Sequence, residues 1–196
     1  HDAVLGPGLG RSREVGDVVE AILKEKRRPP VVLDADGLHP LGGARRAALL
    51  KALREDDCIT PHPGEAARIL DTSSEDVQAA RIESIRALMR EARCTVVLKG
   101  AGTLIARRDT PVYIAPFACP SLAVGGSGDV LSGVIAAYLA RIRACYPVSA
   151  DDAFRAACLG VHVHGKAGEL LDAARPNRGA LAREIADAVP GVARTS

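Results

Sequence analysis

The chain has 196 residues, of which 47% are hydrophobic and 26% charged, a composition typical of one globular domain with a sizeable core. Its net charge is only +2, aromatic residues make up 3% and Trp is absent, which argues against a nucleic-acid patch or a base-stacking platform. The sequence shows no signal peptide and no apolar run of membrane-spanning length, so we expect a cytoplasmic protein without a membrane partner.

Short apolar strands alternate with helical segments in the first half of the chain. Strands are expected at residues 4–5, 31–33 and 58–59. Helices are expected at residues 13–26 and 44–53, the first with Val15, Val18, Val19, Ile22 and Leu23 on its apolar face. This alternation predicts an α/β fold with a mostly parallel sheet that helices cover.

The second half continues the pattern and adds a hairpin. A helix starts at Glu65, and Ser73 with Asp76 forms a capping box for a long helix that reaches about residue 92. Residues 95–98 form the next strand, and residues 104–106 and 112–114 form an antiparallel hairpin at one sheet edge. Helices over residues 150–171 and 181–188 complete the chain.

The first strand runs directly into a glycine-rich turn that contains Gly6, Gly8 and Gly10. Such a turn can be structural or can adjoin a ligand, and its spacing does not match the dinucleotide fingerprint. Because domains seldom begin on a core strand, we expect the natural protein to carry a further N-terminal portion.

The most informative segment is the glycine-rich turn at residues 125–129, which ends on Asp129 and leads into an apolar helix. Glycines and a helix start aim N–H groups at one point, which suits phosphate. A carboxylate there would repel phosphate, but it can remove a proton from a hydroxyl that attacks phosphorus. No lysine follows Gly133 as a P-loop requires, and Asp129 replaces the glycine of a nucleophile elbow. The turn therefore predicts phosphoryl-transfer catalysis, with a purely structural turn as the alternative.

Other polar residues follow the expected strands, at the sheet edge where open α/β sheets bind ligands. Asp34 and Asp36 are two residues apart, so an extended backbone would point them the same way, to hold Mg²⁺ or a hydroxyl or to cap a helix. His62 stands between two prolines before a helix and either contacts a ligand or bonds the loop. Glu65 would favour the helix dipole. Lys99 could pair with phosphate or with Asp34.

Two sets of possible metal ligands lack the right spacing. His162 and His164 are two apart on a helix and face different ways. The cysteines are odd in number and have no CxxC pair, which favours small buried thiols in a reduced protein. They are Cys58, Cys94, Cys119, Cys145 and Cys158.

Together the motifs occur in the order found in the ADP/ATP-dependent NAD(P)H-hydrate dehydratases of the ribokinase-like superfamily, which the chain resembles over nearly its whole length. The resemblance implies a three-layer sandwich of one domain, residues 1–196, with helices on both faces of the sheet. The motifs that carry it are residues 6–10, 33–36, 60–65, 98–103 and 125–129.

The resemblance also implies an activity and a set of partners. Family members return hydrated NADH or NADPH to its normal form, with ADP or ATP as phosphoryl donor and Mg²⁺ expected with the nucleotide. We expect a homo-oligomer and a functional or fused partner, NAD(P)H-hydrate epimerase. The family usually has Gly-Asn-Pro-Gly-Met-Ala-Thr where this chain has Ala-Cys-Pro-Ser-Leu-Ala-Val at residues 118–124.

By this resemblance each motif has a role. Asp129 would deprotonate the 6-hydroxyl of the hydrate, and Gly126, Ser127 and Gly128 would hold the charge that develops on the phosphoryl group. The expected nucleotide contacts are Lys99, Gly100, Ala101, Gly102, Thr103 and Gly128. The expected hydrate contacts are Gly6, Gly8, Gly10, His62 and Asp129.

Two other functions remain open on the sequence. One is a kinase of the same superfamily that phosphorylates a vitamin or sugar alcohol through the same aspartate. The other is a non-catalytic domain that binds adenine nucleotide or serves assembly.

Overall fold

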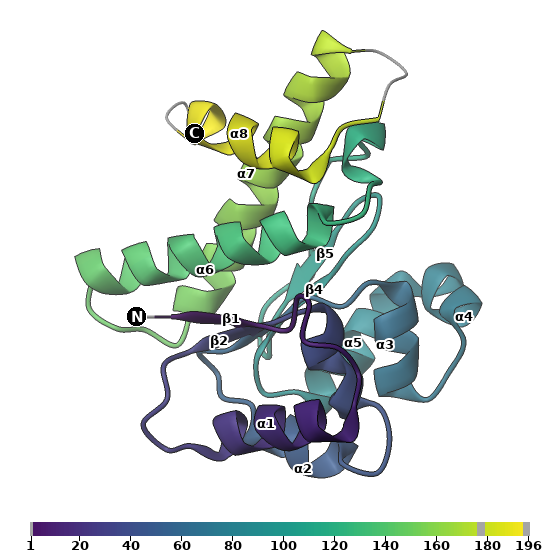
Figure 1. Cartoon of the computed structure of the whole chain (residues 1–196), viewed down its shortest axis with the longest axis vertical. Coiled ribbons are helices and arrows are strands. Elements are labelled where there is room, and N and C mark those ends of the chain that lie inside the picture. Colours follow the sequence, from purple (N-terminus) through teal and green to yellow (C-terminus); the bar gives the residue numbers. More distant parts are fainter. Residues whose placement is uncertain (1, 176–178, 194–196) are drawn as a thin grey trace.

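A computed structural model describes residues 2–175 and 179–193, which contain one six-stranded sheet whose strands lie in chain order (Figure 1). β1 to β4 pair in parallel, and β5 and β6 add an antiparallel edge, as the alternating pattern and the hairpin predicted. The strands are β1 (Ala3–Leu5), β2 (Val31–Leu33), β3 (Cys58–Ile59), β4 (Thr95–Leu98), β5 (Leu104–Ala106) and β6 (Tyr113–Ile114).

Helices cover both faces of the sheet and complete a three-layer sandwich (Figure 1). One face carries α1 (Arg13–Lys24), α2 (Arg46–Ala52), α3 (Pro63–Leu70) and α5 (Arg81–Glu91), with the short α4 (Ser74–Ala79) beside them. The other face carries α6 (Ser127–Cys145) and α7 (Asp152–Ala174), against which α8 (Ala182–Val192) packs. None of these helices has a stretch long and apolar enough to cross a membrane.

The central strands are buried on both faces because their side chains alternate between two cores. Val31 and Leu33 of β2 enter the core under α1, α2, α3 and α5, whereas Val32 enters the core under α6 and α7. Val96 and Val97 of β4 divide in the same way. Continuous apolar strands of this kind are typical of parallel sheets with helices on both sides.

Two local expectations were wrong. Val18 is 52% exposed, because the buried face of α1 consists of Gly16, Val19 and Leu23 and Val18 lies on a different side of the helix. The long helix after Ser73 is two helices, since Ala80 leaves helical geometry at φ −130° and ψ 55°. A short 3-10 helix, η1 (Ala35–Leu41), follows β2.

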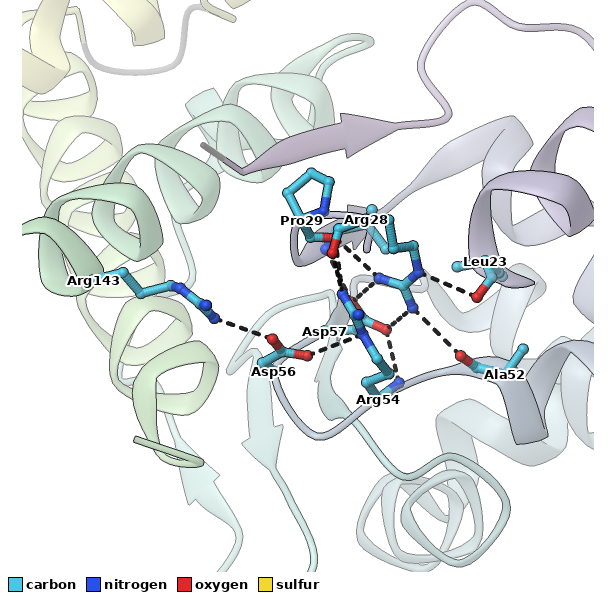
Figure 2. A network of polar contacts seen from close by, with 9 residues as sticks. Leu23, Arg28, Pro29, Ala52, Arg54, Asp56, Asp57 and Arg143 are labelled. Carbon is cyan, nitrogen blue, oxygen red and sulfur yellow. Dashed lines mark hydrogen bonds and ion pairs between the residues drawn. The ribbon is translucent and has the colours of Figure 1, made fainter. Parts of the chain in front are cut away.

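A buried polar network joins the amino-terminal ends of β2 and β3 (Figure 2). Arg28 donates to both carboxylate oxygens of Asp57, at 2.7 and 2.6 Å, and both side chains are almost fully buried. Asp57 also accepts from the backbone N–H groups of Val31 and Arg54. These bonds tie the residue before β3 to the first residue of β2, and so help to fix how the two strands are placed.

Candidate active site

A pocket of about 720 Å³ opens where the carboxyl ends of β2, β3 and β4 meet the start of α6. Parallel strands bring their carboxyl ends to the same edge, which is the reason residues from distant motifs meet there. The expected site residues that line it are His62, Lys99, Gly100, Ala101, Thr103, Ser127, Gly128 and Asp129.

Five expected site residues do not line this pocket: Gly6, Gly8, Gly10, Gly102 and Gly126. A Cβ at Gly6 would come within 1.7 Å of the Asp34 carbonyl oxygen, so this glycine permits close packing of its loop on η1. The N–H of Gly10 donates to Asp36 at 2.9 Å. The N–H of Gly102 donates to the carbonyl of Phe117.

The expectation that Asp34 and Asp36 point the same way was wrong. Ala35 between them has a left-handed φ of 47°, which ends the extended backbone and turns the two side chains apart. Asp36 accepts from Gly10 and Arg11, and these hydrogen bonds hold its carboxyl pKa below the usual value. Asp34 instead is buried against Lys99 and does not cap η1 through its side chain.

Lys99 pairs with Asp34, which was one of the two partners expected for it. The Nζ–Oδ1 distance is 2.5 Å, and the two side chains are 17% and 1% exposed. A Cβ on Gly128 would lie 3.1 Å from the Lys99 Nζ, so the first turn of α6 rests directly on this ion pair. The ion pair therefore lies directly beneath the glycine turn.

His62 starts α3 through a capping box. Its Nδ1 accepts from the N–H groups of Gly64 and Glu65, at 3.0 and 3.3 Å, and its own N–H donates to Glu65 Oε2 at 2.8 Å. An Nδ1 that accepts these bonds leaves the proton of the neutral ring on Nε2. His62 therefore bonds its loop, which confirms one of the two alternatives, and it also lines the pocket. Its contact with a ligand stays a prediction.

Glu65 also lines the pocket, although its place in the sequence predicted only a favourable contact with the helix dipole. Its side chain is 9% exposed, with Oε1 3.4 Å from His62 Nε2 and Oε2 3.9 Å from Lys99 Nζ. Burial raises the pKa of its carboxyl group, an effect that the charge of Lys99 opposes. The spacing of His62 and Glu65 was a signal for the cap, but burial beside Lys99 depends on the tertiary fold.

The glycine turn delivers Asp129 to the pocket in the way its sequence indicated. Gly126 has a left-handed φ of 84° at the start of α6, where residues with a Cβ are strained. Asp129 then falls in the first helical turn, is exposed and lines the pocket. The positive end of the helix and the carboxylate therefore share one wall of the pocket.

His164 is a second residue whose contacts the sequence did not indicate. As expected, it and His162 face different ways: His162 is exposed beside Phe117, whereas His164 is buried. His164 Nε2 lies 3.1 Å from the Ser127 carbonyl oxygen and 3.2 Å from the Ser127 hydroxyl. Burial lowers the pKa of His164 to about 4, so the ring is neutral and donates to the carbonyl oxygen from Nε2.

The segment at residues 118–124 forms an apolar wall of the same pocket. Cys119, Leu122 and Val124 are among its lining residues. A Cβ at Gly168 of α7 would come within 2.6 Å of the Leu122 side chain, so this glycine lets the segment lie close against α7. Burial raises the pKa of the Cys119 thiol, which therefore stays protonated near neutral pH.

Comparison with known proteins shows the family to which this chain is similar. The model of a family described as NAD(P)H-hydrate dehydratase matches residues 1–191. An ADP-dependent (S)-NAD(P)H-hydrate dehydratase of Neisseria meningitidis is 41% identical over 186 residues, which are 94% of this chain and 60% of that protein. A bifunctional NAD(P)H-hydrate repair enzyme Nnr of Moorella thermoacetica is 38% identical over 190 residues, 97% of this chain and 34% of that protein.

Among solved structures, an ADP/ATP-dependent NAD(P)H-hydrate dehydratase of Bacillus subtilis, co-crystallized with ATP/Mg²⁺, superposes with a TM-score of 0.79. It is 28% identical, and the superposition covers 99% of this chain and 64% of that one. The chain thus spans less than two thirds of the length of each of these three proteins.

Proposed function

Because the chain belongs to the NAD(P)H-hydrate dehydratase family, with its ribokinase-like three-layer fold, we propose that it returns the hydrates of NADH and NADPH to NADH and NADPH. ADP or ATP would donate the phosphoryl group. The observation that carries this proposal is the position of Asp129, a carboxylate on the pocket wall at the positive end of α6.

The proposed reaction starts with a proton transfer. Asp129 removes the proton of the 6-hydroxyl group, whose oxygen attacks the terminal phosphorus of the nucleotide. The turn of Gly126, Ser127 and Gly128 and the start of α6 stabilise the charge that develops on the transferred group. Phosphate then leaves C6 with the help of the ring-nitrogen lone pair, and the dihydronicotinamide ring forms again.

The two substrates are assigned to different parts of the site. Lys99, Gly100, Ala101, Gly102 and Thr103, with Gly128, would contact the adenine nucleotide, and all except Gly102 line the pocket. His62 and Asp129 would contact the hydrate. Gly6, Gly8 and Gly10 would do so as well, and for these three residues the support is the resemblance to the family.

Bound Mg²⁺ would neutralise the charge of the nucleotide phosphates. Residues 2–175 and 179–193 hold no group of three or more His, Cys, Asp or Glu side chains that could cage a metal ion. Mg²⁺ bound with a nucleotide is usually held by phosphate oxygens and water, and an ion held in this way needs no such group.

The setting of the enzyme belongs to the same proposal. The five cysteines are free, which fits a reducing compartment such as the cytoplasm. The match to a bifunctional repair enzyme supports NAD(P)H-hydrate epimerase as a functional or fused partner. We further propose a homo-oligomer.

The test is to incubate the chain with ADP or ATP and NADH hydrate and to follow recovery of the absorbance band of NADH. Asp129→Asn should lower turnover about 10²-fold or more while nucleotide binding, measured by calorimetry, changes little. Asp187→Asn, an exposed position on α8, is the matched control and should behave as the parent. Phosphorylation of a vitamin or sugar alcohol without NADH recovery would show a kinase instead.

A further inference from the structure

The proposed reaction must remove two hydrogens from the hydrate, and Asp129 accounts for only one. Loss of phosphate from C6 leaves a positively charged ring in which N1 and C6 share a double bond. The dihydronicotinamide forms only when C5 also loses a proton, whose bonding pair becomes the C5–C6 double bond. The reaction therefore needs an acceptor for this proton near the ring, a role that a side chain of the pocket can fill, provided that the proposed function holds.

Most titratable side chains of the pocket are poorly suited to accept this proton. Lys99 is a cation paired with Asp34. His164 is buried, and its Nε2 donates to the carbonyl oxygen of Ser127. The Cys119 thiol is held in its protonated form by burial.

His62 is also excluded as the acceptor, although it is half exposed and lines the pocket. Its Nδ1 already accepts two backbone N–H groups. The neutral ring consequently carries its proton on Nε2 and offers the pocket a donor.

Glu65 has the features of a proton acceptor. Oε2 is held by the His62 N–H at 2.8 Å, which fixes the carboxylate, while Oε1 lies 3.4 Å from His62 Nε2 and has no shorter polar contact among the described residues. Burial makes the carboxylate more basic than an exposed one. Glu65 and Gly128 both adjoin the Lys99 ammonium, so Glu65 faces the region next to Asp129.

We propose that Glu65 is a second catalytic residue of this pocket, the base whose Oε1 accepts the C5 proton of the hydrate ring. Phosphate leaves with the C6–O bonding pair, and the N1 lone pair forms the N1–C6 double bond. The C5–H pair then forms the C5–C6 double bond, N1 regains its lone pair, and Glu65 carries the proton until it is released to water. No atom is oxidised or reduced in these steps.

Glu65 also caps α3, so the test must separate chemistry from capping. Glu65→Gln keeps an oxygen that accepts from the His62 N–H, but it cannot take a proton. In this variant phosphate still leaves, and the charged ring adds water and returns to hydrate. We expect nucleotide cleavage within a few-fold of the parent rate, while the NADH formed per nucleotide cleaved falls about tenfold or more.

The readout is the ratio of NADH formed, by absorbance, to AMP formed from ADP, by chromatography. Glu184→Gln is the matched control, because Glu184 accepts from the Leu181 N–H at the start of α8 in the same way but lies outside the pocket. It should keep the parent ratio of one NADH for each nucleotide. Glu65→Asp retains a carboxylate but is a poorer cap, so it should keep more of the ratio than Glu65→Gln.

A Glu65→Gln protein with the parent ratio and rate overturns the role of Glu65 and leaves the proposed function intact. A parent chain that forms no NADH from hydrate and nucleotide overturns the proposed function itself. If Glu65→Gln does not fold, as judged by circular dichroism, Glu65→Asp decides, because its shorter side chain withdraws the carboxylate from the ring. A ratio below that of the parent supports the role as base, and the parent ratio in a less stable protein shows a cap only.

Discussion

Lys99 and Asp34, 65 residues apart in the chain, form an ion pair with an Nζ–Oδ1 distance of 2.5 Å directly beneath the first turn of α6. Asp34 Oδ2 is buried and accepts no hydrogen bond from the described residues. The charge of Asp34 is therefore compensated mainly by Lys99. Since Lys99 also adjoins Glu65, this one ammonium group links the ends of β2, α3 and β4.

Removing the Lys99 side chain should consequently lower the free energy of unfolding much more than removing a typical lysine side chain. We expect Lys99→Met to lower the free energy of unfolding by about 3–5 kcal/mol, because it leaves a buried carboxylate without its partner. The double variant Lys99→Met/Asp34→Asn should be more stable than Lys99→Met alone. Urea denaturation followed by circular dichroism measures both changes.

The control for this pair is Lys51→Met, an exposed position on α2, for which a change below about 0.5 kcal/mol is expected. A Lys99→Met protein as stable as the Lys51→Met protein would show that the ion pair contributes nothing to stability.

Gly128 and Gly133 lie in the same helix but in different surroundings. A Cβ at Gly128 would press on the Lys99 ammonium at 3.1 Å, whereas a Cβ at Gly133 would meet nothing within 4 Å. Gly128→Ala should displace the first turn of α6 or the ammonium and lower turnover about tenfold or more. Gly133→Ala should keep the parent turnover and add about 0.5–1 kcal/mol of stability, from helix propensity alone. Steady-state rates and thermal unfolding of both variants test this, and equal turnover would contradict it.

Much of the fold could be predicted because its strands and helices leave strong periodic patterns. The parallel strands, the edge hairpin and the glycine turn at Asp129 were all read from local sequence and confirmed. The break between α4 and α5 was missed because Ala80 is neither Gly nor Pro, the residues that usually signal one. Arg81 shows the tertiary cause, since it donates to the carbonyl groups of Leu98, Lys99 and Gly102.

Most of the expected site residues line one pocket, and the errors have a common origin. Asp34 and Asp36 were assigned one direction because nothing in the sequence signals a left-handed Ala35. Glu65 and His164 were undervalued because their environments are created by residues far away in the chain, Lys99 and Ser127. Spacing within a motif predicts local contacts, but burial beside a distant charge follows only from the packed structure.

His164 predicts a pH dependence of stability. Its pKa is about 4 in the folded protein and 6.5 ordinarily, since burial disfavours the charged ring. As the pH falls from 6.5 to 4, the unfolded chain binds a proton that the folded chain does not, so the free energy of unfolding decreases. The decrease ends below pH 4 and amounts to about 3 kcal/mol. Urea denaturation at several pH values should show this loss in the parent.

His164→Gln removes the titrating group, so its stability should fall less than that of the parent between pH 6.5 and 4. His162→Gln, two residues away and exposed, should keep the parent slope. Parallel pH profiles for the parent and His164→Gln would contradict the assignment.

The Arg28–Asp57 network predicts a loss of stability that is separate from the chemistry (Figure 2). Arg28→Met leaves the buried Asp57 carboxylate with only its backbone donors and should cost about 3–5 kcal/mol of unfolding free energy. Arg27→Met, at the exposed neighbouring position, should cost less than about 0.5 kcal/mol. Thermal and urea unfolding distinguish the two variants.

Arg28→Met should leave turnover unchanged in the molecules that remain folded. Asp57 precedes β3, whereas His62 follows it, so the network and the pocket lie at opposite ends of the same strand. At a temperature where Arg28→Met is still folded, its rate per folded molecule should equal that of the parent. A lower rate with unchanged stability would mean that the network positions the pocket residues rather than holding the sheet together.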